Sequence, residues 1–526
     1  MSGCLALVLH AHLPFVRHPE HEHFLEENWL FEAITETYLP LLRVFGGWQK
    51  DGLRARLAMS LSPTLCAMLR DPLLQQRYLR HLNGLIELSE KEVHRTQWQK
   101  PFDDVAQFYC ERLRDSKVHY ENMGGDLVGA FRQFQDAGTL EILTCAATHA
   151  VLPLLATHAP SLRAQIRAAC DEYRSCFGRD PRGIWLPECA WTENLDPVLR
   201  EANLRWFVLD SHGILHAKPR PRYGIFAPVF TPAGCAAFGR DLDSAKQVWS
   251  RNEGYPGDPR YRDFYRDIGF DLDLEYLQPH LPVKGLRGFT GLKYHRITGG
   301  GRATEPYDRQ AALHAAREHA SHFFHARMGQ FEKLSRILDR PPIVVSPYDA
   351  ELFGHWWFEG PEFLDALVRQ TCSALDSFEL ITPGDYLVRQ PVNQVCAPSA
   401  TSWGAEGYLR VWLNETNAWI YPHLRAAQER MSRLVATARS AAPLAQRALQ
   451  QAGRELLLAQ ASDWPFILRT GTSPDYARKR VTEHLLRFTN LANQISAGAI
   501  DVPYLEQIEA QDNLFAGLDP GHWRET

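Results

Sequence analysis

Short apolar runs that end at a polar or acidic residue recur along the chain and alternate with longer segments of helical spacing. Such a run is typical of a strand buried on both faces, as in a parallel sheet. The strands expected from this pattern are 5–9, 57–61, 142–145, 184–186, 206–209, 343–345 and 378–381. Helical spacing lies between them, for example at 74–90, 105–136, 162–177, 310–338 and 361–377. The alternation predicts an α/β fold, and polar residues at one end of every strand favour a closed parallel barrel over an open sheet.

Two stretches depart from this alternation. Residues 212–285 are rich in Pro, Gly, Arg and Asp and are too long for an unstructured loop, so they predict an inserted subdomain or lid. After about residue 395 the strand pattern ends, and helical spacing predicts a helical domain. The expected division is a barrel at 1–211 and 286–394, an insertion at 212–285 and a helical C-terminal domain at 395–526.

Charge and aromatic content narrow the class of partner. The 526 residues carry a formal net charge of -5 with a pI near 6.5, which argues against nucleic acid and favours a neutral substrate. Fourteen Trp and eighteen Tyr residues, many of them beside Gly, Asp or His, favour a carbohydrate, because aromatic faces stack on sugar rings. For any single aromatic residue, core packing is the simpler explanation.

The cysteines and the first residues bear on location. Ten cysteines are scattered without a CxxC pair, which predicts buried free thiols in a reducing compartment. No export signal and no apolar window of membrane-spanning length is visible. We therefore expect a cytoplasmic protein that is not bound to a membrane.

Two carboxylates beside tryptophans are the main candidates for catalysis. Glu188 follows the apolar run 184–186, and Asp349 follows 343–345. A carboxylate pair at barrel strand ends predicts chemistry at a glycosidic bond, with Asp349 as the acid because burial among aromatic rings raises a carboxyl pKa. Glu351 is the rival acid, ranked second because it lies farther from the strand. The alternative for Glu188 is the cap of a following helix.

Three histidines also lie at predicted strand ends, and they leave two interpretations open. His10 and His12 are two residues apart and so share one side of the first strand, and His149 follows a later strand. A zinc-dependent hydrolase can bind its metal through such a pair. In a glycosidase, the same imidazoles would donate hydrogen bonds to sugar hydroxyls.

Several of these segments occur in the order of a known family. His10-Ala11-His12-Leu13-Pro14-Phe15, the strand before His149, Trp185-Leu186-Pro187-Glu188, Ser346-Pro347-Tyr348-Asp349-Ala350-Glu351 and Thr382-Pro383-Gly384-Asp385 resemble the five sequence regions of glycoside hydrolase family 57. The rest of the chain is similar to the 1,4-α-glucan branching enzymes of that family. The similar segments include Glu27-Asn28-Trp29-Leu30, Trp403-Gly404 and Ser462-Asp463-Trp464-Pro465-Phe466.

The resemblance implies a fold, a reaction and a set of site residues. The fold would be an incomplete parallel (β/α)7 barrel with a small inserted subdomain and an α-helical C-terminal domain. Glu188 would be the nucleophile and Asp349 the general acid/base of a retaining transglycosylase that makes α-1,6 branches on an α-1,4-glucan, without metal or other cofactor, as a monomer or homo-oligomer. The implied substrate-binding residues are His10, His12, His149, Trp29, Arg262, Arg266, Trp403, Trp412 and Asp463.

One departure from the family keeps other activities open. The branching enzymes often carry a tyrosine on a mobile loop near the active site, and the corresponding loop here, 234–241, offers Phe238. Without the hydroxyl, hydrolysis would compete better, so an α-amylase or a 4-α-glucanotransferase of the same fold is an alternative. A metal-dependent hydrolase using His10 and His12 and a barrel that only binds glucan are alternatives of other classes.

Overall fold

The computed structural model describes residues 3–249, 253–281, 283, 285–299, 304–374, 377–437 and 442–525. Met1, Ser2 and Thr526, at the ends of the expected domains, lie outside the described residues. The strands are β1 (Cys4–Ala11), β2 (Leu57–Leu61), β3 (Leu140–Leu143), β4 (Trp206–Leu209), β5 (Val229–Phe230), β6 (Ala236–Gly239), β7 (Ile343–Asp349) and β8 (Glu379–Leu380).

Among the described residues, seven strand segments close into a ring of parallel pairings. β1 pairs with β2 on one side and with β7 on the other, and β2 pairs with β3. Single bridges through residues 183–184 connect the end of β3 to β4. β4 pairs with β6, and a bridge from Arg240 to Val345 leads back to β7. The ring confirms the predicted parallel barrel, although residues 183–184 pair through isolated bridges rather than as a strand.

Two short strands lie outside this ring. β8 pairs with residues 4–5 of β1 and β2 with residues 8–11, so these two strands share one edge of β1. β5 pairs antiparallel with β6. Both β5 and β6 fall within the expected insertion 212–285, so this part of it belongs with the sheet. The sequence pattern did not predict β6, because the apolar run 235–238 is short and lies among Pro and Gly residues. The division into domains as a whole stays a prediction.

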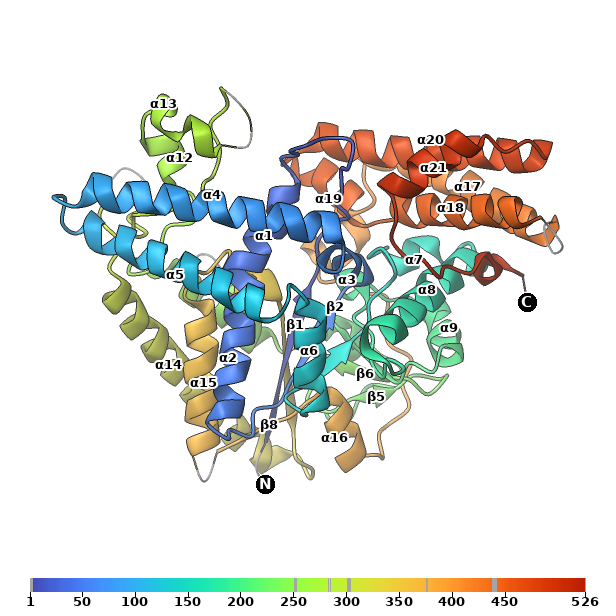
Figure 1. Ribbon diagram of the computed structural model, residues 1–526. Coiled ribbons are helices and arrows are strands. Elements are labelled where there is room, and N and C mark those ends of the chain that lie inside the picture. The colour runs from blue at the N-terminus through green and yellow to red at the C-terminus, as the bar shows by residue number, and fades with distance from the viewer. Residues whose placement is uncertain are drawn as a thin grey trace.

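Helices cover the outside of the ring (Figure 1). The helices of the first half are α1 (Glu27–Ala33), α2 (Leu39–Lys50), α3 (Pro63–Leu69), α4 (Pro72–Thr96), α5 (Phe102–Asn122), α6 (Leu127–Asp136), α7 (Leu152–Leu155), α8 (Ala159–Phe177), α9 (Asp196–Glu201), α10 (Ser211–Leu215) and α11 (Leu242–Trp249). The expected helix 105–136 is two helices, because Gly124 and Gly125 turn the chain at positive φ and Asp126 then caps α6.

The second half of the chain supplies the remaining helices. They are α12 (Ile268–Asp271), α13 (Leu274–Leu277), α14 (Arg309–Ile337), α15 (Gly360–Ser373), α16 (Pro383–Arg389), α17 (Ile420–Thr437), α18 (Pro443–Ala459), α19 (Asp463–Thr470), α20 (Pro474–Ala497) and α21 (Val502–Gln511). α17 to α21 form the helical C-terminal region that the sequence predicts, with α19 near the upper ends of the barrel strands in Figure 1. Backbone bridges from Ala150 to Ala461 and from Trp191 to Thr401 join this region to the barrel.

The two faces of β1 explain why its sequence is apolar throughout. Leu5, Leu7 and Leu9 pack outward into the core shared with the helices. Ala6 and Val8 point the other way, into a second core inside the ring. A strand of a closed barrel buries both faces, so alternation of apolar and polar residues gives way to a continuous apolar run.

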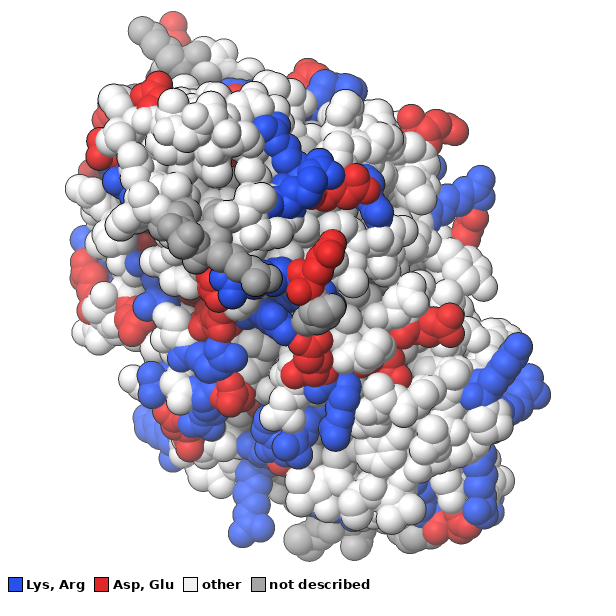
Figure 2. Space-filling view, turned by 90° about the vertical axis from the view of Figure 1, so that its right-hand side faces the viewer, with Lys and Arg blue, Asp and Glu red and all other residues white. Residues whose placement is uncertain are grey.

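Charges of both signs mix on the surface. On the face that Figure 2 shows, Lys and Arg side chains lie among Asp and Glu, and the described residues there form no broad area of one sign. Among the described residues, no helix combines the length and the apolar character that a membrane span needs. All ten cysteines are free, and all except Cys372 are buried.

Candidate active site

His10 and Asp349 end two neighbouring strands on the inner side of the barrel. β1 and β7 pair in a register that sets His10 opposite Asp349. Val8 and Val345 belong to the core inside the ring, and residues two or four positions farther along a strand share their side. Both functional side chains therefore enter the barrel at the carboxyl ends of their strands, where barrel enzymes carry their chemistry.

Glu188 lies on a turn whose backbone conformation glutamate seldom adopts. The φ angles of Glu188 and Cys189 are 63° and 48°, in the left-handed region, which costs about 1–2 kcal/mol for a residue with a side chain. Two donors from the C-terminal third hold the carboxylate. Trp403 Nε1–H donates to Oε2 over 2.8 Å, and the Ser462 hydroxyl donates to Oε1 over 3.1 Å. The Trp403 amide also donates to the Glu188 carbonyl over 2.9 Å, so the turn is fixed at both backbone and side chain.

The two carboxylates differ in their surroundings. Burial raises the pKa of Glu188 to about 7, and the hydrogen bonds from Trp403 and Ser462 oppose this rise by favouring the charged form. Burial, followed by the charges of Glu351 and Glu188, raises the pKa of Asp349 well above its usual value, and Arg240 opposes that rise. The hydrogen bonds at Glu188 thus favour its ionised form, whereas the neighbouring carboxylates of Asp349 favour its protonated form.

Glu351, the rival acid, is engaged in holding a loop. Its Oε1 accepts a hydrogen bond from the Tyr38 hydroxyl over 2.6 Å and another from the His12 amide over 3.2 Å. A carboxylate whose oxygen already ties two segments together is poorly placed to move a proton to a substrate. These contacts favour the ranking of Asp349 ahead of Glu351.

The three histidines form one stack against Trp185. The rings of His12 and His149 lie 3.8 Å apart, and those of His10 and Trp185 lie 4.6 Å apart. His10 Nε2 and His149 Nε2 are 2.9 Å apart, so one of them donates to the other. Burial, followed by the neighbouring His12, lowers the pKa of both His10 and His149 well below the usual value. These two imidazoles are therefore neutral.

The C-terminal region also contacts the histidine stack. His149 Nδ1 lies 2.7 Å from the Ser462 hydroxyl, and His12 Nε2 lies 3.2 Å from each carboxylate oxygen of Asp463. Ser62, at the end of β2, lies 2.8 Å from His12 Nδ1. The structure thus brings together His10, His12, His149, Trp403 and Asp463 around Glu188, from segments far apart in the sequence.

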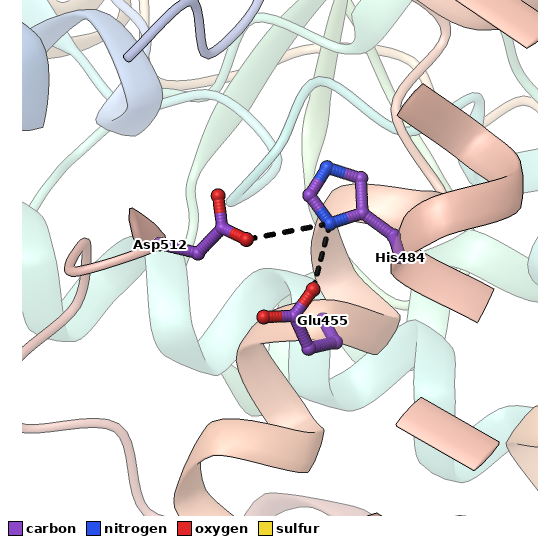
Figure 3. A group of neighbouring side chains, drawn as sticks. All are labelled: Glu455, His484 and Asp512. Carbon is purple, nitrogen blue, oxygen red and sulfur yellow. Dashed lines mark hydrogen bonds and ion pairs between the residues drawn. The ribbon is translucent and has the colours of Figure 1, made fainter. Parts of the chain in front are cut away.

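The metal-hydrolase alternative finds little support in these contacts, because both ring nitrogens of His12 already face hydroxyl or carboxylate partners. Among the described residues, the group that could offer three metal ligands lies elsewhere, at Glu455, His484 and Asp512 (Figure 3). His484 Nδ1 lies 2.7 Å from Glu455 Oε2, and Arg487 donates to Asp512 over 2.6 Å. Arg480 lies 3.6 Å from Asp512 as well. The arginines balance the carboxylate charges, so this cluster is a buried ion-pair network.

Two predicted tryptophans have packing contacts instead of contacts with the carboxylates. Trp412 is 1% exposed and belongs to a small core with Val151 and Ala190, against which Trp403 packs. It therefore supports the loop of Trp403, and its role in substrate binding stays a prediction. Trp29 packs edge-on against Tyr476 at 5.9 Å, between α1 and α20. A role of Trp29 in substrate binding stays a prediction.

Arg262 is held by a buried ion pair and also lines a hollow beside Tyr265 and Trp356, so its role in substrate binding stays a prediction. Its side chain is 0% exposed, lies 2.9 Å from Glu36 Oε1 and stacks on the Phe358 ring. An arginine at this position is buried because Glu36 balances its charge, which the sequence could not reveal for two residues 226 positions apart. Arg266 is half-exposed and pairs with Asp271 over 3.0 Å, so its proposed contact with substrate stays a prediction.

Phe238 is a strand residue and not part of a mobile loop. It lies in β6, is 1% exposed and packs edge-on against Trp206 and Tyr386 inside the barrel. The assignment of Phe238 to the position of the loop tyrosine is therefore wrong. The expectation that this protein lacks the hydroxyl of the loop tyrosine therefore no longer has support.

Two polar residues of the site were missed at the sequence level. Ser462 contacts both Glu188 and His149, and its only signal is its place directly before Asp463. Arg240, which follows β6, lies 3.3 Å from Asp210 and over the Trp403 ring at 5.7 Å. The rule that polar residues after an apolar run mark the site would have found Arg240 if the strand before it had been recognised.

A parallel barrel with two partly buried carboxylates and a stack of neutral imidazoles at its strand ends is typical of an enzyme of the glycoside hydrolase class. The sequence model described as glycosyl hydrolase family 57 matches residues 6–397. A second model, 1,4-alpha-glucan branching enzyme, C-terminal, matches residues 423–523. The chain belongs to glycoside hydrolase family 57.

Individual proteins resemble the chain along its whole length. The 1,4-alpha-glucan branching enzyme of Thermococcus kodakarensis is 32% identical over 98% of this chain and 78% of its own, and a probable 1,4-alpha-glucan branching enzyme of Mycobacterium tuberculosis is 30% identical over 99% and 98%. The structure of an alpha-amylase from Thermotoga maritima has a TM-score of 0.94 at 43% identity and covers 100% of both chains. That of a GH57-type branching enzyme from Pyrococcus horikoshii has a TM-score of 0.90 at 31% identity, with 100% and 97% covered.

Proposed function

We propose that this protein is a 1,4-α-glucan branching enzyme that works by a retaining mechanism. The family, the C-terminal region that matches the branching-enzyme model and full-length similarity to branching enzymes support this activity. The observation that carries the mechanism is the asymmetry between the carboxylates. Glu188 accepts two hydrogen bonds that favour its charged form, whereas the pKa of Asp349 is raised by burial and by neighbouring negative charges.

In the first half of the reaction, Asp349 acts as the acid. It gives its proton to the glycosidic oxygen as the bond to the anomeric carbon breaks, and Glu188 attacks that carbon to form a covalent glycosyl ester. Trp403 and Ser462 hold the Glu188 carboxylate in place for the attack. The neutral imidazoles of His10 and His149 suit hydrogen bonding to the hydroxyls of the donor sugar, because they bring no charge into a buried site.

In the second half, Asp349 acts as the base. It takes the proton of a 6-hydroxyl of another glucan segment, the oxygen attacks the anomeric carbon, and Glu188 departs as a carboxylate. The product is an α-1,6 branch. If water takes the place of the 6-hydroxyl, the same steps give hydrolysis.

Hydrolysis is the second candidate because the alpha-amylase of Thermotoga maritima is 43% identical to this chain over its full length. The two activities share the first half-reaction and differ only in which oxygen resolves the ester. We infer an α-1,4-glucan as the substrate for both. A monomeric or homo-oligomeric state and a cytoplasmic location stay predictions.

Product analysis tests the proposal. Purified protein is incubated with amylose, and one portion is treated with a debranching enzyme before chain-length profiling, while reducing ends are counted in another. New α-1,6 linkages without a matching rise in reducing ends support branching. Reducing ends that rise without new branches would assign the protein as an amylase, and longer unbranched chains would assign it as a 4-α-glucanotransferase.

A further inference from the structure

A groove lined by aromatic side chains lies beside the candidate active site. The residues that line this aromatic groove include Trp249, Phe264, Tyr265, Leu352 and Trp356, together with the polar Arg262 and Asp263, and its volume is about 440 Å³. Trp249, Tyr265 and Trp356 are 40%, 59% and 52% exposed. Exposure of large aromatic side chains to water is unfavourable, and several of them gathered in one hollow are typical of a surface that a ligand covers.

The aromatic groove lies close to residues that surround the catalytic carboxylates. The ring of Trp249 lies 6.4 Å from that of Trp403, whose Nε1–H donates to Glu188. Leu352 is three residues beyond Asp349, at the end of the short helix Ala350–Leu352 that follows β7. The groove therefore borders both the residue that holds Glu188 and the segment that follows Asp349.

Contacts within the protein hold the aromatic side chains of the groove in place. Trp356 stacks on Phe264 at 4.3 Å, which orients its exposed face. Beneath it, Glu36 binds both Arg262, over 2.9 Å, and His355 Nδ1, over 2.7 Å, and so fixes the turn that carries Trp356. The buried arginine thus supports the groove from below, and the aromatic surface needs little ordering when it binds.

The side of the site on which the groove lies determines what it binds. The imidazoles, Ser462 and Asp463 gather around Glu188, which attacks the donor sugar. Asp349, as the acid/base, contacts the glycosidic oxygen that leaves and later the 6-hydroxyl oxygen of the acceptor. A surface formed by the segment after Asp349 therefore faces the acceptor. Apolar faces of glucose units stack on exposed indole and phenol rings, and the net charge of a glucan is zero, which suits an aromatic lining.

We propose that the aromatic groove binds the acceptor segment of the α-1,4-glucan, the one whose 6-hydroxyl resolves the glycosyl ester. This assignment rests on the proposed function. The groove then decides between transfer and hydrolysis, because a bound acceptor raises the local concentration of sugar hydroxyl and excludes water from the ester.

The test compares Trp356→Ala with Trp356→Phe. Each variant is incubated with amylose, and the ratio of new α-1,6 linkages to new reducing ends is measured. We expect Trp356→Ala to lower this ratio by about tenfold, the effect of losing one stacked ring, while cleavage of amylose continues. Trp356→Phe keeps an aromatic face and should keep most of the ratio. Thermal unfolding of both variants checks that the fold is retained.

Trp98→Ala is the matched control, because Trp98 is 88% exposed and lies between α4 and α5, outside the groove. It should leave the ratio unchanged. If Trp356→Ala branches like the wild type, the acceptor assignment is wrong although the proposed function stands. A wild type that only hydrolyses amylose would overturn the proposed function and the acceptor assignment together.

Discussion

The hydrogen bond from Trp403 to Glu188 should set the acidic limb of the pH–rate profile. Trp403 Nε1–H donates to the carboxylate over 2.8 Å, and burial raises the pKa of Glu188 to about 7 against this bond. A hydrogen bond to a charged group contributes about 1.5–3 kcal/mol, which corresponds to a change in pKa of about one to two. The bond favours the ionised form that a nucleophile needs, so its removal in Trp403→Phe should raise the pKa and move the acidic limb to higher pH by that amount.

The measurement is kcat/KM for amylose cleavage as a function of pH. At a pH well below the pKa of Glu188 in both proteins, raising that pKa by one lowers the ionised fraction of Glu188, and with it the rate, by about tenfold. Trp412→Phe is the control, because Trp412 lies in the same loop and, within the described part of the chain, its Nε1 has no hydrogen-bond partner. That variant should keep the acidic limb of the wild type. An unchanged or lowered acidic limb in Trp403→Phe would refute the assignment of Glu188 as the group that must lose its proton.

Three further results are expected. Asp349→Asn should lower kcat for glucans by at least about a thousandfold, whereas Glu351→Gln should retain measurable turnover; equal losses in steady-state assays would contradict the choice of acid/base. Arg240→Met should move the basic limb of the same pH profile upward, because the positive charge now lowers the pKa of Asp349; a downward movement would count against this contact. Asp512→Asn should destabilise the protein by about 3 kcal/mol in denaturant unfolding, because it leaves the buried Arg480 without its carboxylate partner, while Glu406→Gln at an exposed ion pair should not change the midpoint.

The barrel and its two carboxylates could be predicted because their signals are local. An apolar run that ends at a charged residue marks both a buried strand and the strand's functional end. Glu188 and Asp349 follow such runs directly, and the pairing of His10 with Asp349 then follows from the neighbouring positions of β1 and β7. The strand β6 escaped the same rule because its four residues lie in a segment rich in turn formers.

The contacts between segments could not be predicted, because the sequence around a residue does not indicate which distant residue it will contact. Arg262 was predicted to bind substrate, and the structure shows in addition that its guanidinium pairs with the distant Glu36. Trp412 was also predicted to bind substrate, and the structure buries it in a small core against which Trp403 packs. For both residues the sequence indicated an important position. Whether such a side chain binds ligand or supports a neighbouring ligand-binding residue depends on the residues that it contacts in the fold.

The backbone of the site explains why the barrel and the helical region act as one unit. His149, Glu188 and Cys189 all have positive φ, a conformation that residues with side chains keep only when their surroundings impose it. At His149 and Glu188 those surroundings come from the C-terminal third, since the Ser462 amide donates to the His149 carbonyl over 3.1 Å and the Trp403 amide to that of Glu188 over 2.9 Å. The same two residues then hold the Glu188 carboxylate. The C-terminal third thus completes the turn that carries Glu188, and the boundary that the sequence suggests near residue 395 runs through the candidate active site.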